Sequence, residues 1–279
     1  MAITGKGSSG TEEGASPGRA AEKQRRRYEQ ILAFIQKTGS ISVETLSAEL
    51  NVTVVTIRRD LDALEKQGHL SRTHGGAVSG YPMFYEPFKN DRSFTAQVER
   101  SADAKRRIGR AAAAMVGRGE TIAVTPGTTT AEVIRGLPLD SQITLITNTV
   151  NIAMELSKRK DINVFVTGGN LRGDWFSLVG RTAIHSLENA LIQTLFLGAD
   201  GFDAQWGPSC FNQEEAELNG FMVKRARRRI AVVDHTKFSV VANWQMCEIG
   251  EIHILITDTE ATDEMVAPFE ERGIEVLRV

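Results

Sequence analysis

Apolar residues recur every three to four positions in three consecutive segments near the start of the chain. The first runs from about Lys23 to Gly39, the second follows Ser42, and the third lies between Thr53 and Gly68. This spacing predicts three short helices, with Ser42 and Thr53 as N-caps and the two glycines as helix ends. Two short helices joined by a tight turn and preceded by a third are typical of a helix-turn-helix.

The pattern changes after the third predicted helix. Residues 70–78 alternate weakly between apolar and polar side chains and turn at Gly75 and Gly76, which predicts a small hairpin or wing. From residue 102 onward, helical segments alternate with short strands made almost entirely of Val, Ile and Leu. Such strands are buried on both faces, so they predict a mostly parallel sheet with helices on both sides. The expected fold class is α/β, with an N-terminal winged helix-turn-helix.

These patterns divide the chain into four parts. Residues 1–21 are rich in Gly, Ser and Glu and predict a disordered leader. Residues 22–79 form the predicted winged helix-turn-helix, and 102–279 the α/β domain. Between them, residues 80–101 hold two prolines and five aromatic residues without a clear period, as expected of a linker that packs on something.

Composition narrows the class of protein. The net charge of the 279 residues is −2, so contacts with nucleic acid require a local basic surface. Cys210 and Cys247 are the only cysteines and have no CxxC spacing, so we expect no disulfide and no zinc site. Because no apolar run is long enough to cross a bilayer, we expect a cytoplasmic protein without a membrane partner.

The third predicted helix carries the candidate chemistry for DNA binding. If Ile57 and Leu61 face the core, then Arg58 and Arg59 point outward, where arginine can bind guanine through two hydrogen bonds. The same residues also fit a solvated helix face with ordinary charge pairs. Arg25, Arg26 and Arg27 are candidates to neutralise phosphates. The predicted DNA-binding residues are Thr53, Val55, Thr56, Arg58, Arg59, Arg72 and His74.

The whole segment from residue 31 to 78 resembles the DNA-binding domain of the DeoR family of transcriptional regulators. The sequences TIRRDL (Thr56–Leu61) and RTHGGA (Arg72–Ala77) match that family's signature. The resemblance implies that Thr56, Arg58 and Arg59 lie in the DNA groove. It also implies double-stranded operator repeats bound by a homo-oligomer, a dimer or tetramer, because one small module has too little surface for tight specific binding.

A second candidate site lies where a buried strand ends and a helix begins, at residues 125–130. Gly127 lets the backbone approach an anion, the first turn of the helix supplies free N–H groups, and Thr128, Thr129 and Thr130 add hydroxyl donors. The loop fits a phosphate cradle, and it fits equally an ordinary capped turn. Further polar residues follow other predicted strands, and ligands of open α/β sheets bind at these strand ends. The set comprises Thr147, Asn148, Gly168, Gly169, Asp200 and Lys237.

Residues 102–279 also resemble the DeoR-family sensor domain, which is similar in fold to ribose-5-phosphate isomerase. The resemblance implies a phosphorylated sugar effector, with its phosphate on Gly127, Thr128 and Thr129. It also gives Glu215 and residues 234–238 family counterparts. The chain departs from the family at Thr125 and Pro126, where an Asp-Ser pair is usual. A carboxylate that would take a sugar hydroxyl is lost there, and proline removes one N–H from the loop.

We expect no functional site at the histidines, the cysteines or the basic run near residue 225. The five histidines are scattered without metal-ligand spacing, so we expect neither a metal nor a cofactor. The two cysteines have no paired base, and the basic run at residues 224–229 is expected at a helix end, where cations suit the dipole.

The leading hypothesis is a transcriptional regulator, a repressor of sugar or sugar-phosphate genes, without enzymatic activity. The rival is a sugar-phosphate isomerase or hydrolase with a DNA-binding appendage, for which Asp200 and Glu215 are the candidate general bases. The third hypothesis is a structural DNA-binding protein without an effector.

Overall fold

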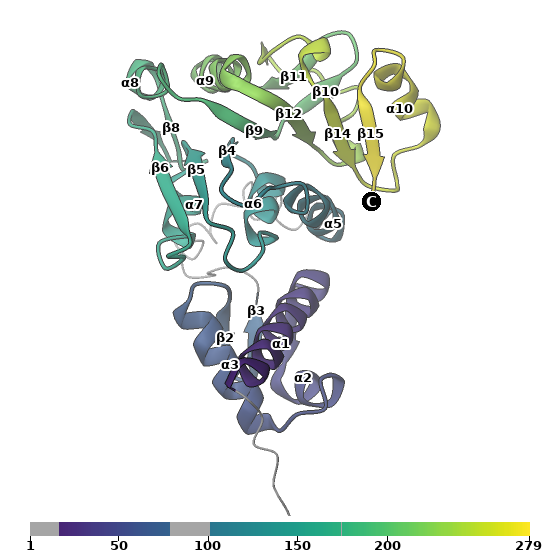
Figure 1. Cartoon of the computed structure of the whole chain (residues 1–279). Coiled ribbons are helices and arrows are strands. Elements are labelled where there is room, and N and C mark those ends of the chain that lie inside the picture. The colour runs from purple at the N-terminus through teal and green to yellow at the C-terminus, as the bar shows by residue number, and fades with distance from the viewer. Residues whose placement is uncertain (1–16, 79–100, 174) are drawn as a thin grey trace, which may run out of the picture.

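The computed structural model describes residues 17–78, 101–173 and 175–279, so residues 1–16 of the expected leader and nearly all of the expected linker lie outside the described residues. A small N-terminal domain lies at one end of the molecule, next to helices α5 and α6 of a larger α/β domain (Figure 1). Among the described residues, no helix is long and apolar enough to cross a membrane.

The N-terminal domain has the predicted helix-turn-helix and wing. Its helices are α1 (Pro17–Thr38), α2 (Val43–Glu49) and α3 (Val54–Lys66), so α1 begins inside the segment expected as a leader. Ser42 and Thr53 are the N-caps: their hydroxyls accept hydrogen bonds from the backbone N–H of Thr45 and Thr56, at 3.0 and 3.2 Å. The predicted apolar stripes form the core of this domain. Ile31, Ile35, Leu46, Ile57, Leu61 and Leu64 are almost completely buried.

The wing is a three-stranded antiparallel sheet in the order β1-β3-β2. Its strands are β1 (Ser40–Ser42), β2 (Ser71–Thr73) and β3 (Gly76–Val78). Gly76 pairs with Ser42, and a Cβ atom there would lie 2.0 Å from the carbonyl oxygen of Ile41. The close approach of β1 and β3 therefore requires glycine at this position.

One buried ion pair joins α1 to α3. The Arg27 guanidinium makes two hydrogen bonds to the Asp60 carboxylate, and both side chains are largely buried. The hydrogen bond to Asp60 raises the pKa of Arg27 above its ordinary value, against the effect of burial. The expectation that Arg27 neutralises a DNA phosphate is therefore wrong, because its charge is satisfied inside the domain. Arg25 and Arg26 are exposed and pair along α1 with Glu29 and Glu22.

The larger domain is built on a seven-stranded sheet whose pairings are all parallel, as predicted. The strand order is β15-β14-β12-β9-β4-β5-β6. In chain order the strands are β4 (Thr121–Val124), β5 (Ile143–Thr147), β6 (Ile162–Val166), β9 (Ile192–Leu197), β12 (Ala226–Val232), β14 (Ile254–Thr257) and β15 (Glu275–Arg278).

Helices cover both faces of this sheet. One apolar cluster joins it to α5 (Ala102–Ala113), α6 (Thr128–Arg135) and α7 (Val150–Glu155). The other joins it to α8 (Arg181–Ser186), α9 (Gln213–Arg225) and α10 (Asp263–Glu270). In β4, β5, β9, β12 and β14, side chains of one strand belong to both clusters, so the middle of the sheet is buried on both sides, as its Val, Ile and Leu content requires. The edge strand β6 instead exposes Phe165 and Val166.

Several short elements were not predicted. β7 (Asn170–Arg172) and β8 (Ser177–Val179) form a hairpin, and β10 (Gly201–Asp203), β11 (Gly207–Cys210) and β13 (Trp244–Gln245) form a small antiparallel sheet. The basic run was placed only partly correctly. Lys224 and Arg225 end α9, but residues 227–229 belong to β12, which pairs with β9.

The two domains are in direct contact. Gln36 of α1 donates a hydrogen bond from Nε2 to the carbonyl oxygen of Arg135, the last residue of α6, at 2.9 Å. Leu139 packs against the apolar core of the N-terminal domain. Gly68 and His69, just after α3, lie against residues 158 and 159 of the larger domain. These contacts join the two domains at the ends of α1 and α3.

Candidate functional site

The order of the strands defines where a ligand can enter the sheet. From β4 the chain proceeds outward through β5 and β6, and then returns to β9 on the other side of β4 before proceeding through β12, β14 and β15. The direction of winding therefore reverses between β4 and β9. A crevice opens at the carboxyl ends of two such strands because their following segments diverge to opposite faces of the sheet.

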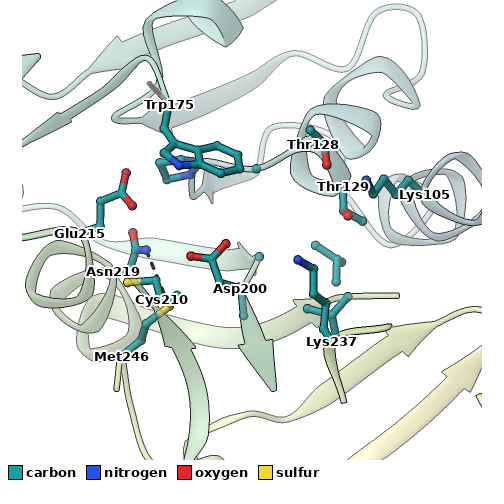
Figure 2. A pocket seen from close by; sticks show the side chains of 16 residues that line it. Lys105, Thr128, Thr129, Trp175, Asp200, Cys210, Glu215, Asn219, Lys237 and Met246 are labelled. Atoms are coloured by element: carbon teal, nitrogen blue, oxygen red, sulfur yellow. Dashed lines mark hydrogen bonds between the residues drawn. The ribbon is translucent and has the colours of Figure 1, made fainter. Parts of the chain in front are cut away.

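A cavity occupies this position. Its walls enclose about 600 Å³ of non-atom space, including the part that is open to solvent. Figure 2 shows the side chains around it, with the Trp175 ring opposite Asp200. They come from the segments that follow β4 and β9, from the end of β12 and the segment after it, from α5 and α9, from β11 and the residue that follows β13, and from the β7–β8 hairpin. The lining residues are Lys105, Pro126, Gly127, Thr128, Thr129, Trp175, Gly198, Ala199, Asp200, Cys210, Glu215, Asn219, Val232, Val233, Lys237 and Met246.

One end of the cavity is built by the loop between β4 and α6. Thr128 and Thr129 open α6 and line the cavity, so the first N–H groups of this helix lie at its wall. Thr130 is used differently: its hydroxyl donates to the carbonyls of Thr125 and Gly127, at 2.8 and 2.9 Å. The Thr125 hydroxyl accepts from the N–H of Gly198, at 3.0 Å, and so ties the loop to the end of β9. The loop is thus held in place from within.

Two lysines lie at the same end (Figure 2). Lys237 belongs to η3 (His235–Lys237), which follows β12. Lys105 comes from α5 and is only 3% exposed. The sequence did not single out Lys105, because it stands in a helix beside Arg106 and Arg107 and no spacing distinguishes it. Two ammonium groups beside the start of a helix make this end suited to an anion such as a phosphate.

Asp200 lies at the centre of the cavity. Its carboxylate accepts a hydrogen bond from the N–H of Phe211, at 3.2 Å. Burial raises the pKa of Asp200 above its ordinary value, and the charge of Lys237 opposes that rise. A buried carboxyl group at this point can form hydrogen bonds with a ligand hydroxyl.

The other end is formed by α9 and the β7–β8 hairpin. Glu215 forms an ion pair with Arg172, at 2.9 Å, and accepts a hydrogen bond from the Ser177 hydroxyl, at 2.5 Å. Asn219 lies one turn further along α9, on the same face as Glu215, and is 3% exposed. The Asn219 side chain was missed by the sequence analysis, because an isolated asparagine inside a helical pattern gives no signal.

Five of the predicted effector-binding residues do not line the cavity: Thr130, Thr147, Asn148, Gly168 and Gly169. Thr147 is the last residue of β5, and the other three follow β5 or β6, further along the same sheet edge, where the β7–β8 hairpin lies over them. The N–H of Leu178 donates to the carbonyl of Asn148, at 2.7 Å, and Gly169 approaches the Val179 carbonyl too closely for a side chain. The predicted members that line the cavity are Gly127, Thr128, Thr129, Asp200 and Lys237.

The predicted DNA-contacting residues are gathered on one side of α3 and in the wing. Arg58 and Arg59 are exposed, and Val55 is 58% exposed, opposite the buried stripe. Thr53 and Thr56 are engaged with each other at the N-cap. His74 is exposed, whereas Arg72 is half-buried and pairs with Asp62. Arg58 and Arg59 thus offer the most accessible positive charge on this face.

A further titratable cluster lies beside the cavity. Ligand atoms of Asp234, His235 and Asp258 lie within 4.8 Å of one another and could hold a metal ion. The Asp258 carboxylate already accepts hydrogen bonds from the backbone N–H groups of His235 and Glu260. The Asp234 carboxylate accepts one from the backbone N–H of Thr236. Although burial opposes it, these donors hold the pKa of Asp258 below its usual range. These hydrogen bonds therefore hold in place the loop that carries Lys237.

The cysteines are not poised for nucleophilic chemistry. Burial raises the pKa of both the Cys210 and the Cys247 thiol to about 12. A thiol with such a pKa is almost wholly protonated at neutral pH, and the thiolate is the reactive form. Cys210 therefore contributes shape to the cavity wall.

Two family models match the chain. The model described as "DeoR-like helix-turn-helix domain" matches residues 27–81, and "DeoR C terminal sensor domain" matches residues 100–259. The chain is 34% identical over 256 residues to a protein of Escherichia coli O157:H7 whose name assigns it to repression of the aga operon; 91% of this chain and 93% of that protein are covered. It is 33% identical to the HTH-type transcriptional regulator GlpR of Haloferax volcanii, covering 92% and 97%. The glycerol-3-phosphate regulon repressor of E. coli K12 is 29% identical, covering 85% and 91%.

Solved structures with similar folds are more distant. Ribose 5 phosphate isomerase A from Neisseria gonorrhoeae matches with a TM-score of 0.36 at 15% identity, over 50% of this chain and 54% of that one. The full-length sorbitol operon regulator SorC from Klebsiella pneumoniae matches with a TM-score of 0.34 at 10% identity, over 77% and 90%.

Proposed function

The chain belongs to the DeoR family of transcriptional regulators, and from this premise we propose that it represses genes of sugar or sugar-phosphate metabolism under the control of a phosphorylated sugar. In this proposal α3 reads operator DNA through Arg58 and Arg59, and the cavity between β4 and β9 holds the effector. The names of the relatives, which include repressors of the aga operon and of the glycerol-3-phosphate regulon, support the class of target genes.

The observation that carries the proposal is the anion-binding end of the cavity. The start of α6, Lys105 and Lys237 present N–H groups and positive charge at one point of the strand edge. A phosphate there would accept charge-assisted hydrogen bonds, which are about twice as strong as neutral ones. Pro126 supplies no N–H, so in this proposal the phosphate lies on the first turn of α6 and on the two lysines.

The same helix supports a route from effector to DNA. α6 begins at the cavity with Thr128 and ends at Arg135, whose carbonyl accepts the hydrogen bond from Gln36 of α1. α5 runs beside it: Lys105 lines the cavity, while the Arg106 guanidinium lies against Gly39 at the end of α1. A ligand that prefers one position of α6 would bias the N-terminal domain, provided that its affinity differs between the two arrangements.

The proposal is tested with purified protein, a selected operator duplex, and a panel of phosphosugars scored by melting shift and by release of DNA. We expect a phosphosugar to raise the melting temperature and to weaken operator binding, without being converted. Failure to bind any duplex at low salt would refute the regulator, and isomerisation or hydrolysis of the sugar would favour an enzyme instead.

Lys237→Gln tests the end of the cavity that is proposed to bind the phosphate. Removing one charged hydrogen-bond donor should lower effector affinity about tenfold or more, and operator affinity without effector should stay unchanged. Lys224→Gln is the matched control, because Lys224 is exposed near the end of α9 and does not line the cavity. Equal effector responses in the two variants would remove Lys237 from the site.

A further inference from the structure

The cavity has two chemically different ends. Lys105, Thr128, Thr129 and Lys237 lie at one end, and Glu215, Asn219 and Met246 at the other, with Asp200 between them (Figure 2). The first end offers positive charge and donors. The second offers the carboxylate of Glu215 and the amide of Asn219, both from α9. A ligand that spans the cavity therefore meets donors at one end and acceptors at the other.

Asn219 is the residue at the second end that the protein leaves incomplete. Its side chain is 97% buried, since only 3% is exposed. The Nδ2 group lies 3.7 Å from the sulfur of Met246, a weak acceptor. Among the described residues, no donor lies within hydrogen-bond reach of Oδ1. Asn219 thus lines the cavity, and its amide oxygen is buried without a partner among the described residues.

Such an atom is costly in a structural role. Burying an amide oxygen without a hydrogen bond is destabilising, so leucine of similar size would stabilise this position better. Glu215, one turn away, already accepts a hydrogen bond from Ser177 and pairs with Arg172. The protein therefore supplies donors to the Glu215 carboxylate but none to the Asn219 oxygen among the described residues. The open acceptor is explained if the ligand supplies its donor.

We propose that Asn219 is a specificity-determining residue whose Oδ1 accepts a hydrogen bond from an O–H or N–H group at the end of the effector remote from its phosphate. The inference rests on the proposed effector cavity. It narrows the ligand class to phosphosugars with a donor at that end, and it disfavours their deoxy analogues. Sites that pair with a ligand hydroxyl reject the analogue that lacks it, because the buried acceptor is then left unpaired.

The test compares the wild-type protein with Asn219→Leu, using as probes glucose 6-phosphate, glucosamine 6-phosphate, inorganic phosphate and a deoxy sugar, 1,5-anhydro-2-deoxyglucitol 6-phosphate, which lacks the donors at both C1 and C2. In the wild type we expect the best-binding donor-bearing sugar to bind at least tenfold more tightly than the deoxy sugar. In Asn219→Leu this preference should collapse to within about threefold, while the affinity for inorganic phosphate stays unchanged. The free variant should melt at the same temperature or higher, because an unpaired oxygen has been removed.

Thr257→Val is the matched control. Thr257 is fully buried in β14 and its hydroxyl also has no partner among the described residues, but it does not line the cavity. This variant should keep the sugar preference of the wild type. The comparison of donor-bearing and deoxy sugars on the wild type needs no variant, so it decides the proposal even if Asn219→Leu does not fold.

The outcomes separate the two proposals. Protection by inorganic phosphate with equal affinity for all three sugars would overturn the role of Asn219 and leave the anion end intact. A melting temperature that falls in Asn219→Leu, with the sugar preference retained, would make Asn219 structural. No protection by any of the four probes would reject the effector cavity itself.

Discussion

Arg58 and Arg59 differ from the other arginines of the N-terminal domain in what surrounds them. Arg25, Arg26, Arg27 and Arg72 each pair with a carboxylate. Within residues 17–78, the structure gives neither Arg58 nor Arg59 such a partner, and both are exposed on the side of α3 opposite its buried stripe. An unpaired guanidinium reaches a base edge without giving up an ion pair, and it has all its donors available.

Arg58→Ala and Arg59→Ala are each expected to weaken operator binding by about 1–3 kcal/mol if they contact a base. The melting temperature should stay the same, because neither side chain is packed. Fluorescence anisotropy at one fixed salt concentration measures the change. Arg272→Ala is the control: Arg272 is an exposed arginine that follows α10, so the same charge is lost on the sheet face opposite α5 and α6. Wild-type affinity in both α3 variants would exclude them as base readers.

At the scale of elements, the sequence predicted what periodicity and caps specify. The three N-terminal helices, the wing and all seven parallel strands follow from apolar spacing. The β7–β8 hairpin and the sheet of β10, β11 and β13 did not, because these short strands mix polar, glycine and apolar residues and lack the Val, Ile and Leu runs of the parallel strands. The residues that line the cavity were also predicted only in part, because only some of them stand next to a pattern that is visible in the sequence. Gly127 and Thr128 follow a clear strand, whereas Lys105 and Asn219 are brought to it only by the packing of α5 and α9.

The ion pair between α1 and α3 should matter for the stability of the N-terminal domain. Arg27→Met leaves the Asp60 carboxylate, which is 2% exposed, without its main partner. Breaking a buried pair in this way costs about 3–5 kcal/mol. Native-state hydrogen exchange of the α1 and α3 amides measures the loss. The double variant Arg27→Met/Asp60→Leu should regain most of it, and a single variant as stable as wild type would show that Asp60 is solvated in solution.

At the scale of the whole molecule, described residues of the two domains meet at several points. They include the Gln36 hydrogen bond, the packing of Leu139, Arg106 against Gly39, and the neighbourhood of Gly68 and His69. Both α6 and α5 reach from this contact to the cavity. We therefore expect the arrangement of the two domains to respond to whatever holds the first turn of α6.

Gln36→Ala should weaken that coupling. We expect the ratio of operator affinities with and without effector to move toward one, about threefold to tenfold, because one hydrogen bond between α1 and α6 is lost. Effector affinity of the DNA-free protein and the fold should change little. Gln30→Ala serves as control, because Gln30 is exposed on the same helix. An unchanged ratio would place the coupling elsewhere.

The contact should also respond to pH through His69. Burial, together with the charge of Arg159, lowers the pKa of His69 from 6.5 to about 3. Between these two values the unfolded chain binds a proton that the folded protein does not, so the free energy of unfolding falls as the pH falls below 6.5. We expect a loss of about 1–2 kcal/mol between pH 7 and pH 5 that His69→Phe abolishes. Chemical denaturation at the two pH values measures it, with His185→Gln, an exposed site, as control. The same loss in wild type and His69→Phe would exclude His69 as its source.

The eight residues of α6 make a rod only about 12 Å long. Swinging such a rod by a few degrees about its ligand end displaces its far end by roughly 1 Å, which breaks one hydrogen bond but leaves Arg58 able to read a base. Such a rotation mainly changes the angle at which α3 meets the DNA. In an oligomer bound to two half-sites, small changes of this angle in each subunit would shift the two α3 helices relative to each other along the DNA. Effector would then change the preferred operator spacing more than the preferred bases, and operators lengthened or shortened by a base pair would regain affinity in its presence.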